Sequence, residues 1–323
     1  LVVYGILLAA SVFALSKIKL NSSNIFQNEI SANGLVKFYD AFNNKVLDFD
    51  VFYPTMDTQK ALNEELGRLH TDRLPRMIKS DSAEITKNVV LISVESLSAE
   101  FMAMYGNKDN VTPFLDSLSK ESLIFPNTFA NGRQSIHGMS SVLAGIPSLK
   151  DAFTSSPYSN QKIQSIVSIC NDLGYDTSFF HSAPNGSMGF LGFSNILGFD
   201  HYYGKTEYNN DADDDGHWGI WDEPFFQYMC RTYSEKKQPF FGTIFTLSSH
   251  HPFQIPKKYE GKFPVGHLEI HKCIGYTDYA LKLFFECAKK QPWFENTIFA
   301  FVNDHPNQVY YDLYKEPITG MGA

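Results

Sequence analysis

Apolar residues recur along the chain in short runs separated by longer stretches of mixed character. The clearest run is 88–94, NVVLISV, in which only Asn88 and Ser93 are polar. Valine and isoleucine are stiff at the branched β-carbon, and an almost unbroken apolar run suits a strand that is covered on both faces. Further strands are predicted at 123–130, 175–182, 239–251 and 296–305.

Segments with helical character lie between these runs. Thr112 and Pro113 read as the N-cap and the first helical position of one helix. Further helices are expected at 135–143, 162–173, 220–234 and 269–290. Strands that alternate with helices in this way predict an α/β fold, a mostly parallel sheet sandwiched by helices.

The chain before this alternation divides into two parts. Residues 1–16 are apolar and carry no charge, so residues 1–19 are interpreted as the end of a transmembrane helix, with a signal-peptide core as the rival interpretation. Residues 20–87 read as a linker with short helices, one of them at 59–69. Residues 88–323 form the main domain.

Composition excludes some classes of function. The 323 residues are 43% hydrophobic and carry a formal net charge of −8 without a basic run, which argues against a nucleic-acid partner. The four cysteines form no CxxC motif, which argues against a zinc cage, and they are too few for a disulfide scaffold.

Three predicted strands end in residues that can bind a metal ion. Glu95 follows the first strand, His250 and His251 close the strand at 239–251, and Asp304 and His305 close the last one. Ligand sites in parallel sheets lie at the carboxyl ends of the strands, and carboxylates together with imidazole suit Mn²⁺, Mg²⁺ or Zn²⁺. Each residue alone has an ordinary alternative; Glu95, for example, could merely cap the next turn.

Ser135 is the candidate nucleophile. It stands in the loop NGRQSIHG at the predicted start of a helix, where free N–H groups and the positive end of the helix dipole favour an alkoxide or a phosphate. The alternative is an ordinary N-cap serine. Arg133, two residues earlier, could meet a phosphate or lie on the surface as many arginines do.

A second group of candidates lies beside the acidic run DADDDGHW. His217 and Trp218 could line the substrate cleft, or they could simply pack or lie on the surface. The run lacks the spaced acids, glycine and closing glutamate of an EF-hand, so a solvated acidic loop is favoured over a calcium site.

The order of the motifs resembles that of the alkaline phosphatase/sulfatase superfamily, and more closely that of the lipoteichoic acid synthase branch of membrane-anchored phosphoglycerol transferases. The resemblance covers about residues 88–305. The motifs that carry it are VLISVES, VTPFLDSL, NGRQSIHG…LAGIPSL, HWGIWDEPFF, FTLSSHHPF and FVNDH. In the family more chain follows the Asp-His pair, so closing strands are expected to be missing from 88–323.

The resemblance implies roles for individual residues. It implies a metal site made from Glu95, Ser135, Asp304 and His305, with Ser135 at the position where the branch usually has a threonine nucleophile. His250 matches a catalytic substrate-pocket histidine.

A further substrate histidine of the branch falls at His181. The Trp and Arg that follow it in lipoteichoic acid synthases are replaced here by Met188 and Phe190.

The implied function is that of a phosphotransferase or hydrolase that depends on one divalent metal and acts through a covalent intermediate on Ser135. Mn²⁺ is the first choice of metal, with Zn²⁺ or Mg²⁺ as alternatives. The implied substrate is a membrane lipid or glycan phosphodiester with a phosphoglycerol-type headgroup. The implied location is the cytoplasmic membrane, with an extracytoplasmic catalytic domain.

Two other functions stay open at this stage. One is sulfate-ester hydrolysis, against which the absence of a CxPSR-type motif argues. The other is a catalytically silent, membrane-tethered binding domain, in which Pro306 after the Asp-His pair could disturb the site.

Overall fold

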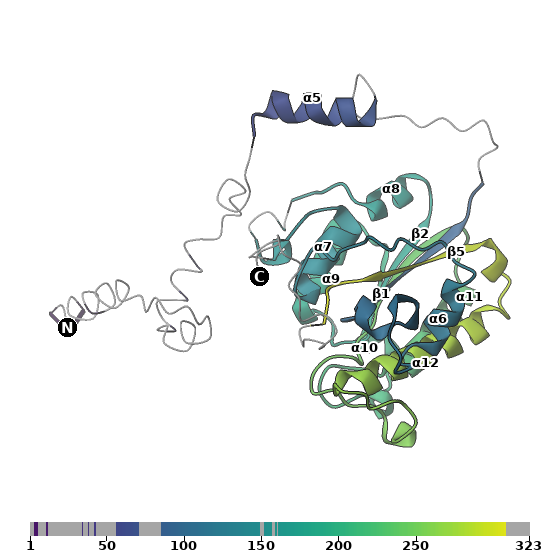
Figure 1. Ribbon diagram of the computed structural model, residues 1–323. Coiled ribbons are helices and arrows are strands. Elements are labelled where there is room, and N and C mark those ends of the chain that lie inside the picture. The colour runs from purple at the N-terminus through teal and green to yellow at the C-terminus, as the bar shows by residue number, and fades with distance from the viewer. Residues whose placement is uncertain are drawn as a thin grey trace. The chain divides into compact units, whose positions relative to one another are not determined.

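The computed structural model describes residues 3–5, 11, 34, 38, 42, 56–70, 85–148, 152–156, 159 and 161–307 (Figure 1). The chain divides into two units, Leu1–Tyr53 and Pro54–Ala323. Most of the first unit lies outside the described residues, including nearly all of the membrane helix expected at 1–19. Among the residues that are described, no helix combines the length and apolar character needed to cross a bilayer.

The second unit contains a sheet of five parallel strands in the order β3-β2-β4-β1-β5. The strands are β1 Asn88–Val94, β2 Asp176–His181, β3 His201–Tyr203, β4 Phe240–Phe245 and β5 Thr297–Asn303. β1 lies between β4 and β5, with Ser93 opposite Phe245 and Val94 opposite Asn303. The carboxyl ends of these three strands therefore meet at one edge of the sheet.

Helices cover both faces of the sheet (Figure 1). Neighbouring residues of a strand point to opposite faces, and Phe179 and Phe180 of β2 show what each face meets. Phe180 packs in one cluster with residues of α11 (Asp222–Ser234) and α12 (Ile270–Ala288), whereas Phe179 contacts Phe190 at the start of α9 (Phe190–Leu197). The α-helices are α5 Thr58–Leu69, α6 Pro113–Ser119, α7 Ser135–Ala144, α8 Ile166–Asp172, α9 Phe190–Leu197, α10 Lys205–Tyr208, α11 Asp222–Ser234 and α12 Ile270–Ala288.

The predicted α/β sandwich is confirmed, and the differences are local. The segment 123–130 is not a strand but an extended stretch with turns, and Leu123, Phe125 and Phe129 on it are exposed. The helix predicted to start at 162 begins instead at Ile166, because Ser165 and Ser168 form a reciprocal capping box. β4 ends at Phe245 because the chain then turns.

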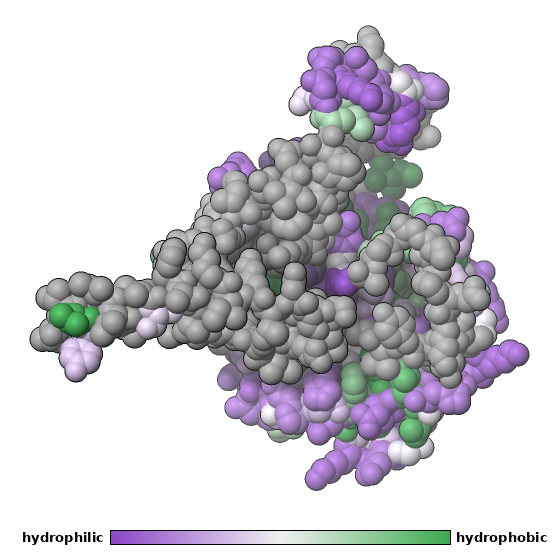
Figure 2. All heavy atoms as spheres, turned by 60° about the vertical axis from the view of Figure 1, so that its left-hand side comes forward, coloured by the Kyte–Doolittle hydropathy of each residue, from purple (hydrophilic) through white to green (hydrophobic). Residues whose placement is uncertain are grey.

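The surface of the described residues on the face shown in Figure 2 is mainly hydrophilic, and apolar side chains appear there only in small patches. This is the pattern expected of helices that bury their apolar side against a sheet.

A disulfide joins α11 to α12 through Cys230 and Cys287, which are 57 positions apart. We expect the double variant Cys230→Ser/Cys287→Ser to lose about 4 kcal/mol of unfolding free energy, since the link restricts a loop of this length in the unfolded chain. Urea unfolding would measure the loss. Dithiothreitol should lower the urea midpoint of the wild-type protein as far as the double substitution does. It should leave the midpoint of the double variant unchanged. A wild-type midpoint that is equal with and without reductant would contradict the disulfide between Cys230 and Cys287.

Candidate active site

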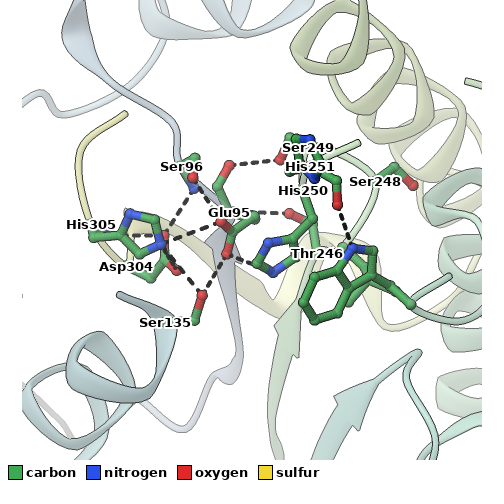
Figure 3. Close-up of polar contacts among 12 residues, drawn as sticks. Glu95, Ser96, Ser135, Thr246, Ser248, Ser249, His250, His251, Asp304 and His305 are labelled. Atoms are coloured by element: carbon green, nitrogen blue, oxygen red, sulfur yellow. Dashed lines mark hydrogen bonds and ion pairs between the residues drawn. The ribbon is translucent and has the colours of Figure 1, made fainter. Parts of the chain in front are cut away.

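The side chains that follow β1 and β5 meet one another and the start of α7 (Figure 3). Ser135 Oγ donates a 2.8 Å hydrogen bond to Glu95 Oε2 and lies 3.4 Å from His305 Nε2. His305 Nε2 lies 3.3 Å from Glu95 Oε1 and 3.2 Å from Asp304 Oδ2. All four side chains are buried, with exposed fractions of 4% or less. The structure thus brings together the four residues predicted to hold a metal.

The donor set fits a divalent cation. Atoms of Glu95, Asp304 and His305 that could bind a metal all lie within 4.8 Å of one another. Asp304 uses Oδ1 to accept bonds from the N–H groups of Ser96 and His305, whereas Oδ2 accepts no hydrogen bond among the described residues and faces only the ion-pair contact with His305 Nε2 at 3.2 Å. A buried carboxylate oxygen in this state favours a positive charge beside it. Carboxylate, imidazole and hydroxyl groups are all suitable ligands for Mn²⁺, Mg²⁺ or Zn²⁺.

The electrostatics of the cluster are those of crowded negative charge. Burial raises the pKa of Glu95, but the hydrogen bond from His305 and the charges of His250 and His305 outweigh it and lower the pKa to about 2. Burial and the Glu95 carboxylate raise the pKa of Asp304 well above its usual value. Burial lowers the pKa of His305, but its bond to Glu95 and the charge of Asp304 raise it to about 9. The negative charge of Glu95 thus raises the pKa of both Asp304 and His305, and the same charge would stabilise a cation at this place.

Local structure explains how Ser135 reaches Glu95. The N-cap of α7 is Gln134, in an extended conformation and without a side-chain cap bond, so Ser135 is the first helical residue. Its hydroxyl is therefore not used as an N-cap and points to Glu95 instead. α7 also approaches the end of β5 very closely. A Cβ on Gly138 would lie 2.5 Å from the Asp304 carbonyl oxygen, so only glycine fits here without a shift of the backbone.

Ser96 is a member of the site that the sequence prediction missed. Its N–H donates to Asp304 Oδ1 at 3.0 Å and its hydroxyl donates to Glu95 Oε1 at 2.7 Å. It has a positive φ of 55°, a conformation that costs free energy for a residue other than glycine. This backbone turn directs both donors of Ser96 into the cluster. The only signal in the sequence was its place directly after Glu95.

His250 lies beside the cluster on the turn after β4. Its Nε2 is 3.4 Å from Glu95 Oε2, and its ring stacks on Trp218 with centroids 4.4 Å apart. Trp218 is held in turn by a 2.6 Å bond from Nε1 to the His251 carbonyl. Burial lowers the pKa of His250 despite the nearby Glu95 carboxylate. The structure therefore places His250 next to the predicted metal ligand Glu95 and places Trp218 against the ring of His250.

His181, another predicted substrate residue, occupies the end of β2 and is fully buried. Burial lowers its pKa to about 3, so its ring is neutral at physiological pH. Nδ1 lies 3.3 Å from the Tyr202 hydroxyl, and Nε2 has no hydrogen-bond partner among the described residues.

Arg133 and His217 are both exposed. For His217, the backbone explains its place. Asp215 Oδ1 accepts bonds from the N–H groups of His217, Trp218 and Gly219. The acidic run thus shapes the turn that carries Trp218.

Comparison with known proteins agrees with this geometry. The sequence model of the family described as Sulfatase matches residues 87–321, well over half of the chain. The chain belongs to the sulfatase family. The expectation of a sulfatase-superfamily enzyme is confirmed at this level.

Among curated proteins, the chain is similar to lipoteichoic acid synthase 2 of Bacillus subtilis. It is 25% identical over 293 residues, which cover 84% of this chain and 44% of that protein. The chain spans less than half the length of the curated relatives it matches. The resemblance to lipoteichoic acid synthases is thus found again over most of this chain.

Solved structures show the same fold. A protein of the alkaline phosphatase superfamily from Vibrio parahaemolyticus is 28% identical with a TM-score of 0.70, and the match covers 80% of this chain and 65% of that one. The lipoteichoic acid synthase LtaP from Listeria monocytogenes is 21% identical with a TM-score of 0.61, covering 68% of this chain and 56% of LtaP. These matches confirm the alkaline phosphatase-like fold.

Proposed function

We propose that this protein transfers or hydrolyses a phosphodiester-linked headgroup through a covalent intermediate on Ser135. The observation that carries the proposal is the 2.8 Å hydrogen bond from Ser135 Oγ to Glu95 inside a buried cluster of carboxylates and imidazole. Similarity to proteins named lipoteichoic acid synthases supports a phosphoglycerol-type headgroup on a membrane lipid or glycan.

Glu95, Ser135, Asp304 and His305 would hold one divalent metal, with Mn²⁺ as the first choice and Zn²⁺ or Mg²⁺ as alternatives. When bound, such an ion lowers the pKa of the serine hydroxyl and stabilises negative charge on the phosphoryl oxygens. A free serine hydroxyl is a weak nucleophile at neutral pH, which is why this contribution is needed.

The protein's own residues then perform two displacements. Glu95 accepts the hydrogen bond of Ser135 and thereby orients Oγ, whose proton passes to His250 as the bond from Oγ to phosphorus forms and the bond to the leaving alkoxide breaks. His250, whose Nε2 faces the same Glu95 carboxylate, holds the phosphate or protonates that alkoxide. An acceptor hydroxyl or water then attacks the phosphorus, the bond from phosphorus to Ser135 Oγ breaks, and the proton of the acceptor passes to Oγ and restores the serine hydroxyl.

The proposed location is the outer face of the cytoplasmic membrane. The uncharged apolar stretch at 1–16 supports a membrane anchor. The disulfide between Cys230 and Cys287 supports an oxidising compartment, where such bonds persist.

The test is an intact-mass measurement on the full-length protein incubated with Mn²⁺ and bacterial phospholipid. We expect an added mass on Ser135, located by peptide mapping, that equals a phosphoglycerol or related group. The Ser135→Ala variant, treated in the same way, should show no adduct. A metal-loaded wild-type protein that gains no adduct, yet hydrolyses aryl sulfate and not aryl phosphodiester, would replace this proposal with a sulfatase.

A further inference from the structure

Asp222 is a buried acid that the proposed chemistry does not use. It is the first residue of α11, and only 3% of it is exposed. We propose that Asp222 is a positioning residue, which fixes the turn at 246–250 and through it holds His250 beside Glu95. This inference rests on the proposed function, because His250 matters there as the group that meets the substrate.

The carboxylate of Asp222 binds the turn directly. Its Oδ1 accepts a 2.8 Å bond from the Leu247 N–H, and both oxygens lie 3.3 Å from the Ser248 nitrogen. The Asp222 N–H donates back to Ser248 Oγ at 3.0 Å. From α12, Thr277 Oγ1 donates to Asp222 Oδ2 at 2.6 Å. Asp222 therefore ties the exit of β4 to two helices at once.

The opposite side of the same turn is attached to the backbone of Glu95. The Glu95 N–H donates to Thr246 Oγ1 at 2.9 Å, and Ser249 Oγ donates to the Glu95 carbonyl at 2.8 Å. The turn closes with a 3.1 Å bond from the His250 N–H to the Leu247 carbonyl. His250 is thus the end of a five-residue turn that is fixed from both sides, and Figure 3 shows the side that is attached to Glu95.

A purely structural role for Asp222 would be to stabilise the start of α11, since acids favour the first turn of a helix. The contacts argue for more than that. The hydrogen bonds that the Asp222 carboxylate accepts come from the turn after β4 and from α12. Burial also raises the pKa of Asp222 to about 6 although four donors face it. Burial of the Asp222 carboxyl is unfavourable for its charged form. We infer that the carboxyl is kept there because its hydrogen bonds hold the turn at 246–250.

A double-mutant cycle with His250 separates positioning from general stability. We expect Asp222→Ala to lower kcat by about 10- to 100-fold with KM changed less than about threefold, and to lower kcat by less than about threefold when His250→Ala is already present. Asp222→Asn, which can still accept from the turn, should recover most of the loss. Equal losses from Asp222→Ala in both backgrounds would overturn the inference.

A second readout needs no activity. Diethylpyrocarbonate modifies accessible neutral imidazoles, and the exposed neighbour His251 serves as an internal reference. We expect the ratio of His250 to His251 labelling, measured by mass spectrometry, to rise in Asp222→Ala and to return in Asp222→Asn. The exposed control Asp211→Ala should not change it. If Asp222→Ala fails to fold, Thr277→Val should give a smaller rise of the same sign.

The two readouts distinguish the possible failures. An unchanged labelling ratio in folded Asp222→Ala and Thr277→Val overturns the positioning role, whatever the activity is. A wild-type protein that acts on no phosphodiester while the ratio rises would overturn the proposed function and leave the positioning of His250 in place.

Discussion

Replacing Ser135 with alanine should lower kcat for phosphodiester turnover by a factor on the order of 10⁴ or more, because the variant has no atom that can form the covalent intermediate. The fold should be kept, since the hydroxyl makes no N-cap bond and α7 begins with Gln134 as its cap. Steady-state rates with an aryl phosphodiester, compared at equal metal occupancy, measure the loss.

Ser135→Thr is the matched control. It keeps a hydroxyl at the same position, so activity should remain well above that of Ser135→Ala. The side chain is buried, with 3% exposed, so the extra methyl group should cost part of the rate. Full activity in Ser135→Ala would show that no bond to this residue forms during turnover.

The residues at the ends of strands could be predicted from the sequence for a clear physical reason. Parallel strands end at the same edge of a sheet, so the apolar runs before Glu95 and before Asp304 and His305 were enough to expect a common site. The structure brings these side chains within hydrogen-bonding or ion-pair distance. Ser135 lies on a helix whose packing the sequence does not show, and its placement depended on the resemblance.

Other features could not be read from the sequence because their partners are far away in the chain. Asp222 binds a turn that lies about 25 positions later in the chain. It also binds Thr277, which lies about another 30 positions beyond that turn. Thr246 and Ser249 were assigned to a strand that in fact ends at Phe245. The apolar alternation at 123–130 predicted a strand that is not formed, since a strand needs a neighbour and the described sheet offers none there.

Replacing Glu95 with glutamine should cost nearly as much as the loss of Ser135. The amide keeps the shape of the side chain but removes the negative charge, and a metal contributes several kcal/mol of charge stabilisation. At about 1.36 kcal/mol per factor of ten, a loss of about 4 kcal/mol is a thousandfold fall in rate. Titration calorimetry with MnCl₂ should show that Glu95→Gln binds Mn²⁺ at least about 100-fold more weakly than the wild-type protein. Even residues outside the first coordination sphere affect metal affinity about 10- to 100-fold.

Glu100→Gln provides the control, because it makes the same chemical change on the loop after β1. Glu100 Oε1 accepts a 3.0 Å bond from Asn307 and belongs to no contact within the cluster. Both Mn²⁺ affinity and rate should stay at the wild-type level in this variant. Wild-type protein treated with EDTA should lose activity to the extent that Glu95→Gln does, and added Mn²⁺ should restore it. If EDTA abolished turnover while Glu95→Gln retained most of it, the essential metal would have to bind elsewhere, since among the described residues no other carboxylate has a hydrogen bond from Ser135 Oγ.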